Sequence, residues 1–258
     1  MKEALRSAAE APNVGRWSWT VGAREGGRIE MTARTSSESN TRPATSARLR
    51  LAAWAGTIAP LLFVGTFTVE GFLRSGYDPA SMYISALSLG PRGWIQVANF
   101  IVLGLLLLVF TRGLPGELKV GKGSKAGPIL LTVLALLFLI SGPFVMDPTG
   151  TALSQATLHG TIHGLAGGIV FLLMPTICFV YLRRFLADPT WQSLRPWTLV
   201  LGTIEAVGVF VFTIVSKLPQ LAIPLAGWLG LLQRAALVPF MLWLFGFGLQ
   251  LLRRSRRG

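Results

Sequence analysis

The chain has 258 residues, of which 52% are hydrophobic and only 14% are charged, and its mean hydropathy is +0.57. Soluble domains carry about 25% charged residues, so the composition excludes an ordinary soluble protein. The net charge is +13, but the basic residues lie in the tails and in short links between apolar runs, where membrane topology explains them. We therefore expect no nucleic-acid partner. The single cysteine, Cys178, lies inside an apolar run, so no disulfide can form within the chain.

The first 48 residues are polar, basic and without hydrophobic periodicity. Such a segment cannot bury enough apolar surface to offset its chain entropy, so residues 1–48 are predicted to be a disordered basic tail. No apolar stretch follows the first basic residues, which excludes a signal peptide. Met31 stands where a start would fit, and one hypothesis is that residues 1–30 come from a misassigned start codon. Residues 253–258 form a second basic tail.

Six long apolar runs lie between these tails, in a domain that we place at residues 49–252. A helix needs roughly 20 apolar residues to cross about 30 Å of hydrocarbon, and each run is too long and too apolar to be a strand. The sequence therefore predicts an all-α integral membrane bundle of six helices. The predicted spans are residues 51–72, 94–113, 128–146, 158–182, 197–215 and 226–252.

The basic residues alternate between the two sides of these spans. Both tails and the links after spans 2 and 4 are rich in arginine and lysine, whereas the other links carry only Arg74, Arg92 and Lys217. Because basic residues favour the cytoplasmic side, both termini are predicted to be cytoplasmic. Arginine outnumbers lysine, as is typical of GC-rich bacterial genomes, and we expect a bacterial cytoplasmic membrane.

The link between the first two spans is the longest external one. Its residues 80–89 are half apolar and lie between Asp78-Pro79 and Gly90-Pro91. This pattern predicts a short helix on the outer interface, which begins near Asp78 and ends at Gly90.

Ionisable and amide side chains inside the spans gather in their outer half. Such groups are costly in a membrane and are functional candidates by default, so we predict an outward-facing polar pocket. The competing interpretation is that they cap helices and anchor loops. The candidate residues are Glu70, Asp78, Gln96, Asn99, Asp147, His159, His163, Glu205 and Arg234.

Two of these candidates lie deep enough to require a partner. At a rise of 1.5 Å per residue, Arg234 lies roughly 9 Å and Glu205 roughly 15 Å below the outer surface, within reach of one arginine side chain. An unpaired charge at either depth is costly, so we predict an ion pair between Glu205 and Arg234. Gly202 and Gly208 flank Glu205 and leave room for a close neighbour. Whether the pair is structural or part of a site stays open.

The two histidines, His159 and His163, are spaced i, i+4 and share one helix face. This spacing suits a metal such as zinc, with Asp147 or Asp78 as a further ligand. The HExxH pattern is absent, and histidines that are hydrogen-bonded at the mouth of a helix are the competing interpretation. No catalytic residue can be named.

A second stripe on the same helix consists of Gly160, Gly164 and Gly168. Small residues at this spacing let two membrane helices approach closely. We expect the stripe to pack against a neighbour within the chain, and a homodimer through it is the alternative.

Several segments carry a resemblance to a known family. In the first external link, Tyr-Asp-Pro at 77–79 is followed by Tyr-Ile-Ser-Ala-Leu at 83–87 and Gly-Pro-Arg-Gly-Trp-Ile-Gln at 90–96. Met-Asp-Pro at 146–148 closes the third span, the histidine stretch opens the fourth, and Gly-Leu-Leu-Gln-Arg at 230–234 opens the sixth.

Together these segments resemble domain of unknown function 998, a family of six-span membrane proteins of bacteria and archaea. The likeness runs over residues 52–252 and implies a multi-pass bundle. The family has no assigned activity, so the resemblance gives no catalytic residues. Glutamate is common in the family where this chain has Gln233, which speaks against a role that needs a carboxylate there.

Three functions fit these features. We favour a non-enzymatic membrane protein that binds a lipid, another amphiphile or a partner in the outward-facing pocket. One alternative is a metal-dependent membrane enzyme at the outer leaflet, for which the ligand set is incomplete. The other is a proton-coupled small-molecule transporter that uses Glu205, although no inverted repeat is evident. The ligand, the metal content and the oligomeric state are not determined by the sequence.

Overall fold

The structure is a computed structural model, and it describes residues 17–22, 30–35, 42–118 and 125–256. The chain divides into two compact units, Met1–Thr45 and Ser46–Gly258. Most of the predicted N-terminal tail and part of the link after the second span lie outside the described residues. The two units are described separately below.

The first unit contains an antiparallel hairpin of β1 (Trp17–Gly22) and β2 (Glu30–Thr35). Trp17 lies opposite Thr35, and Val21 lies opposite Met31. Large apolar side chains at every second position of β1 suit a strand. The prediction of a disordered tail did not anticipate this hairpin, although the alternation Trp-Ser-Trp-Thr-Val is visible in the sequence.

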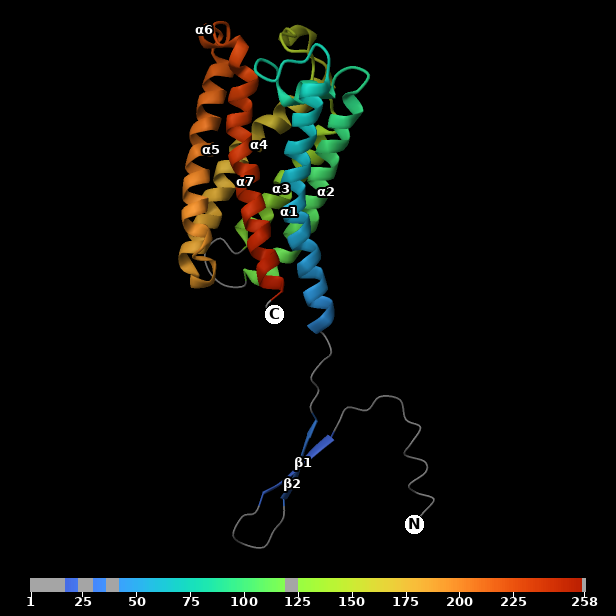
Figure 1. Cartoon of the computed structure of the whole chain (residues 1–258), viewed down its shortest axis with the longest axis vertical. Coiled ribbons are helices and arrows are strands. Elements are labelled where there is room, and N and C mark those ends of the chain that lie inside the picture. The colour runs from blue at the N-terminus through green and yellow to red at the C-terminus, as the bar shows by residue number, and fades with distance from the viewer. Residues whose placement is uncertain (1–16, 23–29, 36–41, 119–124, 257–258) are drawn as a thin grey trace. The chain divides into compact units, whose positions relative to one another are not determined.

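The second unit is helical, and Figure 1 shows its long helices running side by side. Short turns of helix lie in the links: η2 (Ile84–Ser88), η3 (Leu153–Gln155), η4 (Pro189–Trp191), α6 (Pro219–Ala222) and η5 (Ala226–Trp228). The long helices are α1 (Arg42–Leu73), α2 (Gly93–Glu117), α3 (Ala126–Ser141), α4 (Leu158–Ala187), α5 (Leu194–Lys217) and α7 (Leu229–Ser255).

Five of these helices, all but α3, are long and apolar enough to cross a membrane among the residues that the structure describes. Leu61, Leu105, Leu172 and Phe210 are at least half exposed on them. Apolar side chains exposed in such number are typical of a surface that contacts lipid. The chain is therefore a multi-pass membrane protein, as predicted.

Helix α3 differs from the prediction of a span over residues 128–146. It has 16 residues and ends at Ser141. Gly142 and Pro143 follow, and proline has no backbone N–H with which to continue the helical hydrogen bonds. Residues 142–152 then form turns and extended chain. The predicted six apolar helices are present, but only five reach the length of a span.

The helices form a closed ring in which each packs against its neighbours in the sequence. Contacts join α2 to α3, α3 to α4, α4 to α5, and α5 to α7. Helix α1 completes the ring between α2 and α7, because Gly113 of α2 lies against Ala52, and Gly248 of α7 lies against the backbone of Gly56. Glycines at these crossings let the helix backbones approach closely.

Two prolines sit where a neighbouring helix offers a glycine. A proline leaves the carbonyl four residues earlier without its helical donor, and for Pro60 and Pro239 these carbonyls belong to Gly56 and Ala235. A Cβ atom on Gly248 would lie 2.8 Å from the oxygen of Gly56, and one on Gly208 would lie 2.9 Å from that of Ala235. The glycines thus bring a Cα–H group to each freed carbonyl, a weak but recurring helix–helix contact.

The ring has two different ends. We call the end that carries residues 74–92 the η2 end, and these residues the η2 loop. The opposite end carries residues 188–193 and the last turn of α7, and we call it the arginine end. Figure 1 shows α6 at the same end as the η2 loop and the C-terminus at the opposite end.

Candidate functional site

The η2 loop folds into the end of the bundle. The sequence predicted an interfacial helix over residues 80–89, but only the five residues of η2 are helical, and Ile84 and Leu87 are buried. The backbone N–H of Ile84 donates to Oε1 of Gln233 at 2.7 Å, and Leu231 N donates to Ala80 O at 3.0 Å. The loop therefore covers this end of the bundle and is held there by hydrogen bonds to α7.

Arg234 is the main polar link between α7 and the loop. Its Nη1 donates to the carbonyl oxygens of Pro79 at 2.8 Å and Met82 at 3.1 Å, and its Nη2 donates to Oη of Tyr77 at 2.7 Å. Burial raises the pKa of Tyr77, so the phenol keeps its proton and can donate to the carbonyl of Tyr83. The guanidinium is thus occupied by neutral acceptors.

The predicted ion pair between Glu205 and Arg234 is not formed. Among the described residues, ion pairs join Arg92 to Glu70, Arg184 to Asp188 and Arg254 to Glu117. The prediction assumed that an arginine inside the membrane needs a carboxylate partner. Here the carbonyl oxygens of the η2 loop accept the hydrogen bonds of the guanidinium instead.

Glu205 is fully buried, where α5 faces α4. Its Oε2 accepts a hydrogen bond from Sγ of Cys178 at 3.7 Å, and its Oε1 has no partner among the described residues. The expectation that Gly202 and Gly208 admit close neighbours is confirmed, because Gly202 faces Cys178 of α4 and Gly208 faces α7.

Two further candidates stabilise the η2 loop. Glu70 is only 4% exposed and forms a bidentate pair with Arg92, at 2.8 Å to Nε and 2.6 Å to Nη2. Asp78 accepts from the N–H groups of Ala80 and Ser81 and from the Ser81 hydroxyl. The Ser81 hydrogen bond is the main cause of a lowered pKa of Asp78. Both residues anchor the loop, as the competing interpretation of the sequence proposed.

Asp147 and Thr157 together start α4. The Thr157 hydroxyl caps the helix by accepting from Gly160 N at 2.9 Å, and it donates to Asp147 at 2.7 Å. A Cβ on Gly160 would collide with the Asp147 carboxylate, so the first glycine of the predicted stripe makes room for this cap. Ser, Thr, Asp and Asn are the preferred N-cap residues.

The histidines do not converge on a common point with Asp147. Nδ1 of His163 lies 2.8 Å from the carbonyl oxygen of Phe144, whereas the exposed ring of His159 lies beside the Phe144 ring. Within the described part of the chain, no group of three or more His, Cys, Asp or Glu side chains could hold a metal ion. The geometry therefore gives the zinc hypothesis no ligand set.

Gly164 and Gly168 do not pack within the chain. A Cβ on either residue, or on Gly167, would meet no atom within 4 Å. The expected packing of this stripe against a neighbouring helix is wrong for these positions. The homodimer through Gly160, Gly164 and Gly168 stays a prediction.

Beneath the η2 loop lies a cavity of about 40 Å³. Its walls come from α1, α2, α3, α4, α7 and η2. They are lined by Phe63, Ile84, Ser85, Phe100, Phe138, Ser141, His163, Gly167, Val170, Phe171, Gln233 and Leu237. No charged side chain is among them, and only Ser85, Ser141, His163 and Gln233 are polar.

Two polar atoms of this lining are unused. A carbonyl oxygen can only accept, so Nδ1 of His163 must donate to Phe144, and in the neutral ring Nε2 is then an acceptor. Gln233 uses Oε1 for Ile84, which leaves its Nε2 as a donor. Among the described residues, Nε2 of Gln233 makes no hydrogen bond, and Nε2 of His163 makes none either, while the backbone of Ser141 lies beside the same ring as that of Phe144. The cavity therefore offers one donor and one acceptor.

Of the predicted pocket residues, only His163 lines this cavity. Asn99 donates to Phe63 O at 3.1 Å and to Gln96 Oε1 at 3.3 Å, and Nε2 of Gln96 is buried without a partner among the described residues. Ser85, Ser141 and Gln233 were missed, because short hydroxyl side chains and single amides are common in apolar runs and give no strong signal.

Residues 57–250 match the family described as protein of unknown function (DUF998). The chain belongs to this family, as the resemblance implied. No curated protein and no solved structure matches the chain.

Proposed function

We propose that this member of the DUF998 family is a non-enzymatic membrane protein that binds a neutral amphiphile, with the polar head of the ligand in the cavity beneath the η2 loop. The observation that carries the proposal is the uncharged lining, in which one acceptor, Nε2 of His163, and one donor, Nε2 of Gln233, are unused. A hydroxyl group both donates and accepts, so it can satisfy both atoms at once.

The chemistry of the lining argues against a charged head. A phosphate or carboxylate would lose its hydration without gaining a positive partner, which is costly in a medium of low dielectric constant. Arg234 cannot supply the charge, because Pro79, Met82 and Tyr77 occupy its guanidinium. The remaining walls, with Phe63, Phe100 and five other hydrophobic side chains, suit an apolar stem.

Helix α4 supports an entry from the lipid side. Gly167 lines the cavity, and Gly164 and Gly168 beside it are exposed, where an added Cβ would meet no atom of the described residues within 4 Å. Because these glycines leave space on that face of α4, an alkyl chain can lie there while the head reaches His163. Gly164 and Gly168 would then serve lipid access.

The proposal also includes an orientation. Among the described residues, Arg183, Arg184, Arg195, Arg253 and Arg254 lie at the arginine end, and an excess of basic residues favours the cytoplasmic side. The cavity would then face outward, with both termini in the cytoplasm of a bacterium. In a Cys178→Ala background, a cysteine at Thr151 should react with a membrane-impermeant maleimide in intact cells, and one at Gln192 should not. The reverse pattern would overturn the orientation.

Binding can be tested with three probes that share one alkyl chain: dodecanol, dodecyl phosphate and dodecyltrimethylammonium. We expect dodecanol alone to raise the thermal unfolding temperature of the purified chain in a saturable way. Gln233→Leu should abolish the shift, whereas Gln220→Leu, an exposed glutamine of α6, should retain it. Equal shifts by all three probes, or an unchanged response of Gln233→Leu, would contradict the proposal.

A second candidate, proton-coupled transport, is favoured by one observation, the unpartnered Oε1 of the fully buried Glu205. An ionisable group in this position is a candidate for proton binding. Neither the cavity beneath the η2 loop nor the hollow at the arginine end is lined by Glu205, so a path to it would need a second conformation. A proton-coupled flux that survives Glu205→Gln would exclude this role.

A further inference from the structure

The arginine end contains a larger hollow, which lies apart from the cavity beneath the η2 loop. Its volume is about 410 Å³, within the range of about 300–1,000 Å³ that is typical of small-ligand sites. It is bounded by the link between α4 and α5 and by the last turns of α7. The lining residues are Pro189, Thr190, Gln192, Ser193, Gln250, Arg253 and Arg254.

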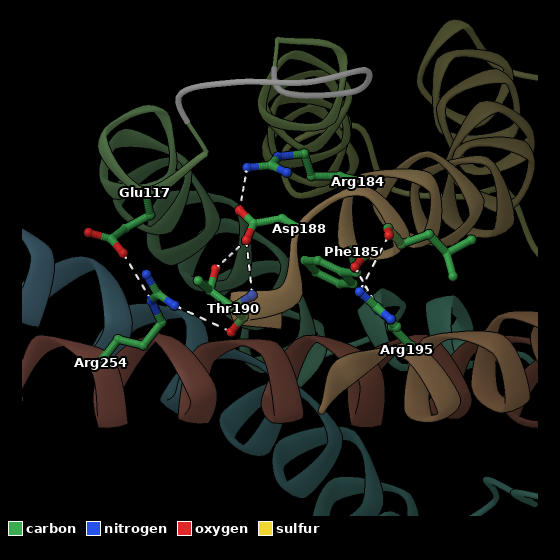
Figure 2. Close-up of polar contacts among 8 residues, drawn as sticks. Glu117, Arg184, Phe185, Asp188, Thr190, Arg195 and Arg254 are labelled. Atoms are coloured by element: carbon green, nitrogen blue, oxygen red, sulfur yellow. Dashed lines mark hydrogen bonds and ion pairs between the residues drawn. The ribbon is translucent and has the colours of Figure 1, made fainter. Parts of the chain in front are cut away.

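The carboxylates at this end are occupied by other groups. Asp188 accepts from Nη2 of Arg184 at 2.7 Å and from the N–H and hydroxyl of Thr190 at 2.9 and 2.6 Å (Figure 2). These bonds, chiefly that from the Thr190 hydroxyl, lower the pKa of Asp188, so it stays ionised and paired. Glu117 accepts from Nε of Arg254 at 3.1 Å. Neither acid lines the hollow.

Arg254 is held in a fixed plane beside the hollow. Its guanidinium carbon lies 4.6 Å from the centre of the Trp191 ring, its Nε donates to Glu117, and its Nη1 donates weakly to Thr190 O at 3.4 Å (Figure 2). Its Nη2 has no partner among the described residues. Stacking on an aromatic face pre-organises an arginine and leaves its edge free to donate.

Arg253 is a charge in the lining of the hollow that no described residue neutralises. It is exposed, lines the hollow and makes no hydrogen bond or ion pair with described residues. Arg195 is not available in the same way, because its Nε donates to Phe185 O at 2.8 Å and caps the end of α4 (Figure 2). The hollow therefore combines an unpaired positive charge, a fixed guanidinium edge and the neutral donors of Gln192 and Ser193.

We propose that this hollow binds a phosphate group, and that the phosphate belongs to the headgroup of an anionic lipid. Arginine matches phosphate oxygens with several N–H donors at once. The apolar side chains of Leu199 and Val200 on α5 are more than half exposed, and Trp197 is 41% exposed, so an acyl surface begins one to two turns from the hollow. Trp side chains mark the membrane interface, and basic pockets at that level take anionic headgroups.

The site is independent of the amphiphile cavity, because no residue lines both. Full-length protein in neutral detergent should be titrated with phosphatidylglycerol and with phosphatidylcholine, and binding followed by native mass spectrometry and by the unfolding temperature. We expect phosphatidylglycerol alone to bind specifically. Arg253→Gln should weaken it about fivefold, the effect of one basic residue near an anionic headgroup.

Arg183→Gln is the matched control. Arg183 is an exposed arginine at the same end of α4, but it does not line the hollow, so its variant should bind as the wild type does. Arg253 bonds to no other group in the described part of the chain, so its variant is expected to fold. Equal weakening by both substitutions would mean unspecific attraction and would overturn the proposal, as would no weakening by Arg253→Gln.

Inorganic phosphate serves as a third probe, and it separates the two sources of the same chemistry. If millimolar phosphate raises the unfolding temperature of the wild type but not of Arg253→Gln, and phosphatidylglycerol does not, the site takes a soluble phosphate and the lipid assignment is wrong. If phosphatidylglycerol acts and inorganic phosphate does not, the lipid assignment holds.

Discussion

The two ends of the helical ring use arginine in opposite ways. At the η2 end, Arg234 donates to three carbonyl oxygens and a phenol, and the cavity beside it has no charged lining. At the arginine end, Arg184 and Arg254 pair with carboxylates, and Arg253 stays free beside an open hollow. At the η2 end the arginine fixes a loop over a cavity. At the arginine end a positive charge stays available for an external anion.

This difference shows that the position of a charge in the sequence says little about its partner. Arg234 lies in an apolar helix, yet its acceptors are neutral, and those of Pro79, Met82 and Tyr77 belong to a loop more than 150 residues away in the chain. Asp188 and Arg184 are four residues apart on one helix end. The spacing of four residues indicates the contact between Arg184 and Asp188, whereas the contacts of Arg234 depend on the tertiary fold.

The largest contrast between the ends should follow removal of their fixed arginines. Arg234→Met leaves the acceptors of Pro79, Met82 and Tyr77 without a donor, and since one unsatisfied group costs about 1–3 kcal/mol, we expect a loss of about 3 kcal/mol in the free energy of unfolding. Arg254→Met breaks the ion pair with Glu117, in which the arginine side chain is 30% exposed. Such pairs contribute about 1 kcal/mol or less to the free energy of unfolding. Detergent-induced unfolding measures both.

Protease cleavage adds a local readout for the same pair of variants. Arg234→Met should expose the η2 loop to cleavage near Met82, whereas Arg254→Met should not. If both variants lost the same free energy of unfolding and the η2 loop stayed uncut, the two arginines would not differ in how they stabilise their ends.

Glycine substitutions provide the next contrast. A Cβ on Gly230 would lie 2.4 Å from Met82 O and 2.5 Å from Pro79 O. Backbone atoms cannot yield easily, so Gly230→Ala should cost about 1–3 kcal/mol. Gly116 lies near the arginine end of α2 and meets nothing within 4 Å, so Gly116→Ala should be neutral or stabilise by up to about 1 kcal/mol. Thermal unfolding of both variants checks the sign, and a stabilising Gly230→Ala would show that the loop is loosely packed.

The apolar helices could be predicted from the sequence because apolar length is a local property. One exception was α3, whose end at Ser141 is signalled by Gly142-Pro143, a boundary that the apolar run obscured. The partner of Glu205 could not be predicted, because depth along a helix gives no direction around it. The hydrogen-bond partner of Glu205 is Cys178, which is indistinguishable in the sequence from the apolar residues around it.

The candidate site was predicted in part for a similar reason. Charged residues stand out in apolar runs, and Glu70, Asp78 and Arg234 do gather around the η2 loop. They proved to be its anchors, and none of them lines the cavity beneath the loop, whose polar lining includes Ser85 and Gln233 instead. Uncharged polar residues carry little cost in a helix, so their position in the sequence does not indicate a pocket.

Glu205 lies between the two ends, and the question is whether its unpaired carboxyl group is charged. We expect its carboxyl group to be neutral, because a buried charge with no positive partner is costly. Glu205→Gln should then change the free energy of unfolding by less than about 1 kcal/mol. Glu70→Gln is the matched control, and it should cost about 1.5–3 kcal/mol because it breaks a bidentate pair with Arg92. A larger loss for Glu205→Gln than for Glu70→Gln would indicate a charged carboxylate where α5 faces α4.

The smallest expected effect is a pH dependence confined to the η2 end. Hydrogen bonds from Ser81 and Ala80 lower the pKa of Asp78 in the folded protein below its ordinary value of 3.8. The stabilisation of the turn is therefore fully present above the ordinary pKa and is lost as the pH falls through the lower, folded value. Protease cleavage of the loop should rise below about pH 4 in the wild type, measured with an acid-active protease. Asp78→Asn keeps an acceptor that does not titrate, so its cleavage should vary less with pH. Asp188 at the arginine end has a lowered pKa for a similar reason, and Asp188→Asn should leave the cleavage profile of the η2 loop unchanged, because the two aspartates hold separate turns.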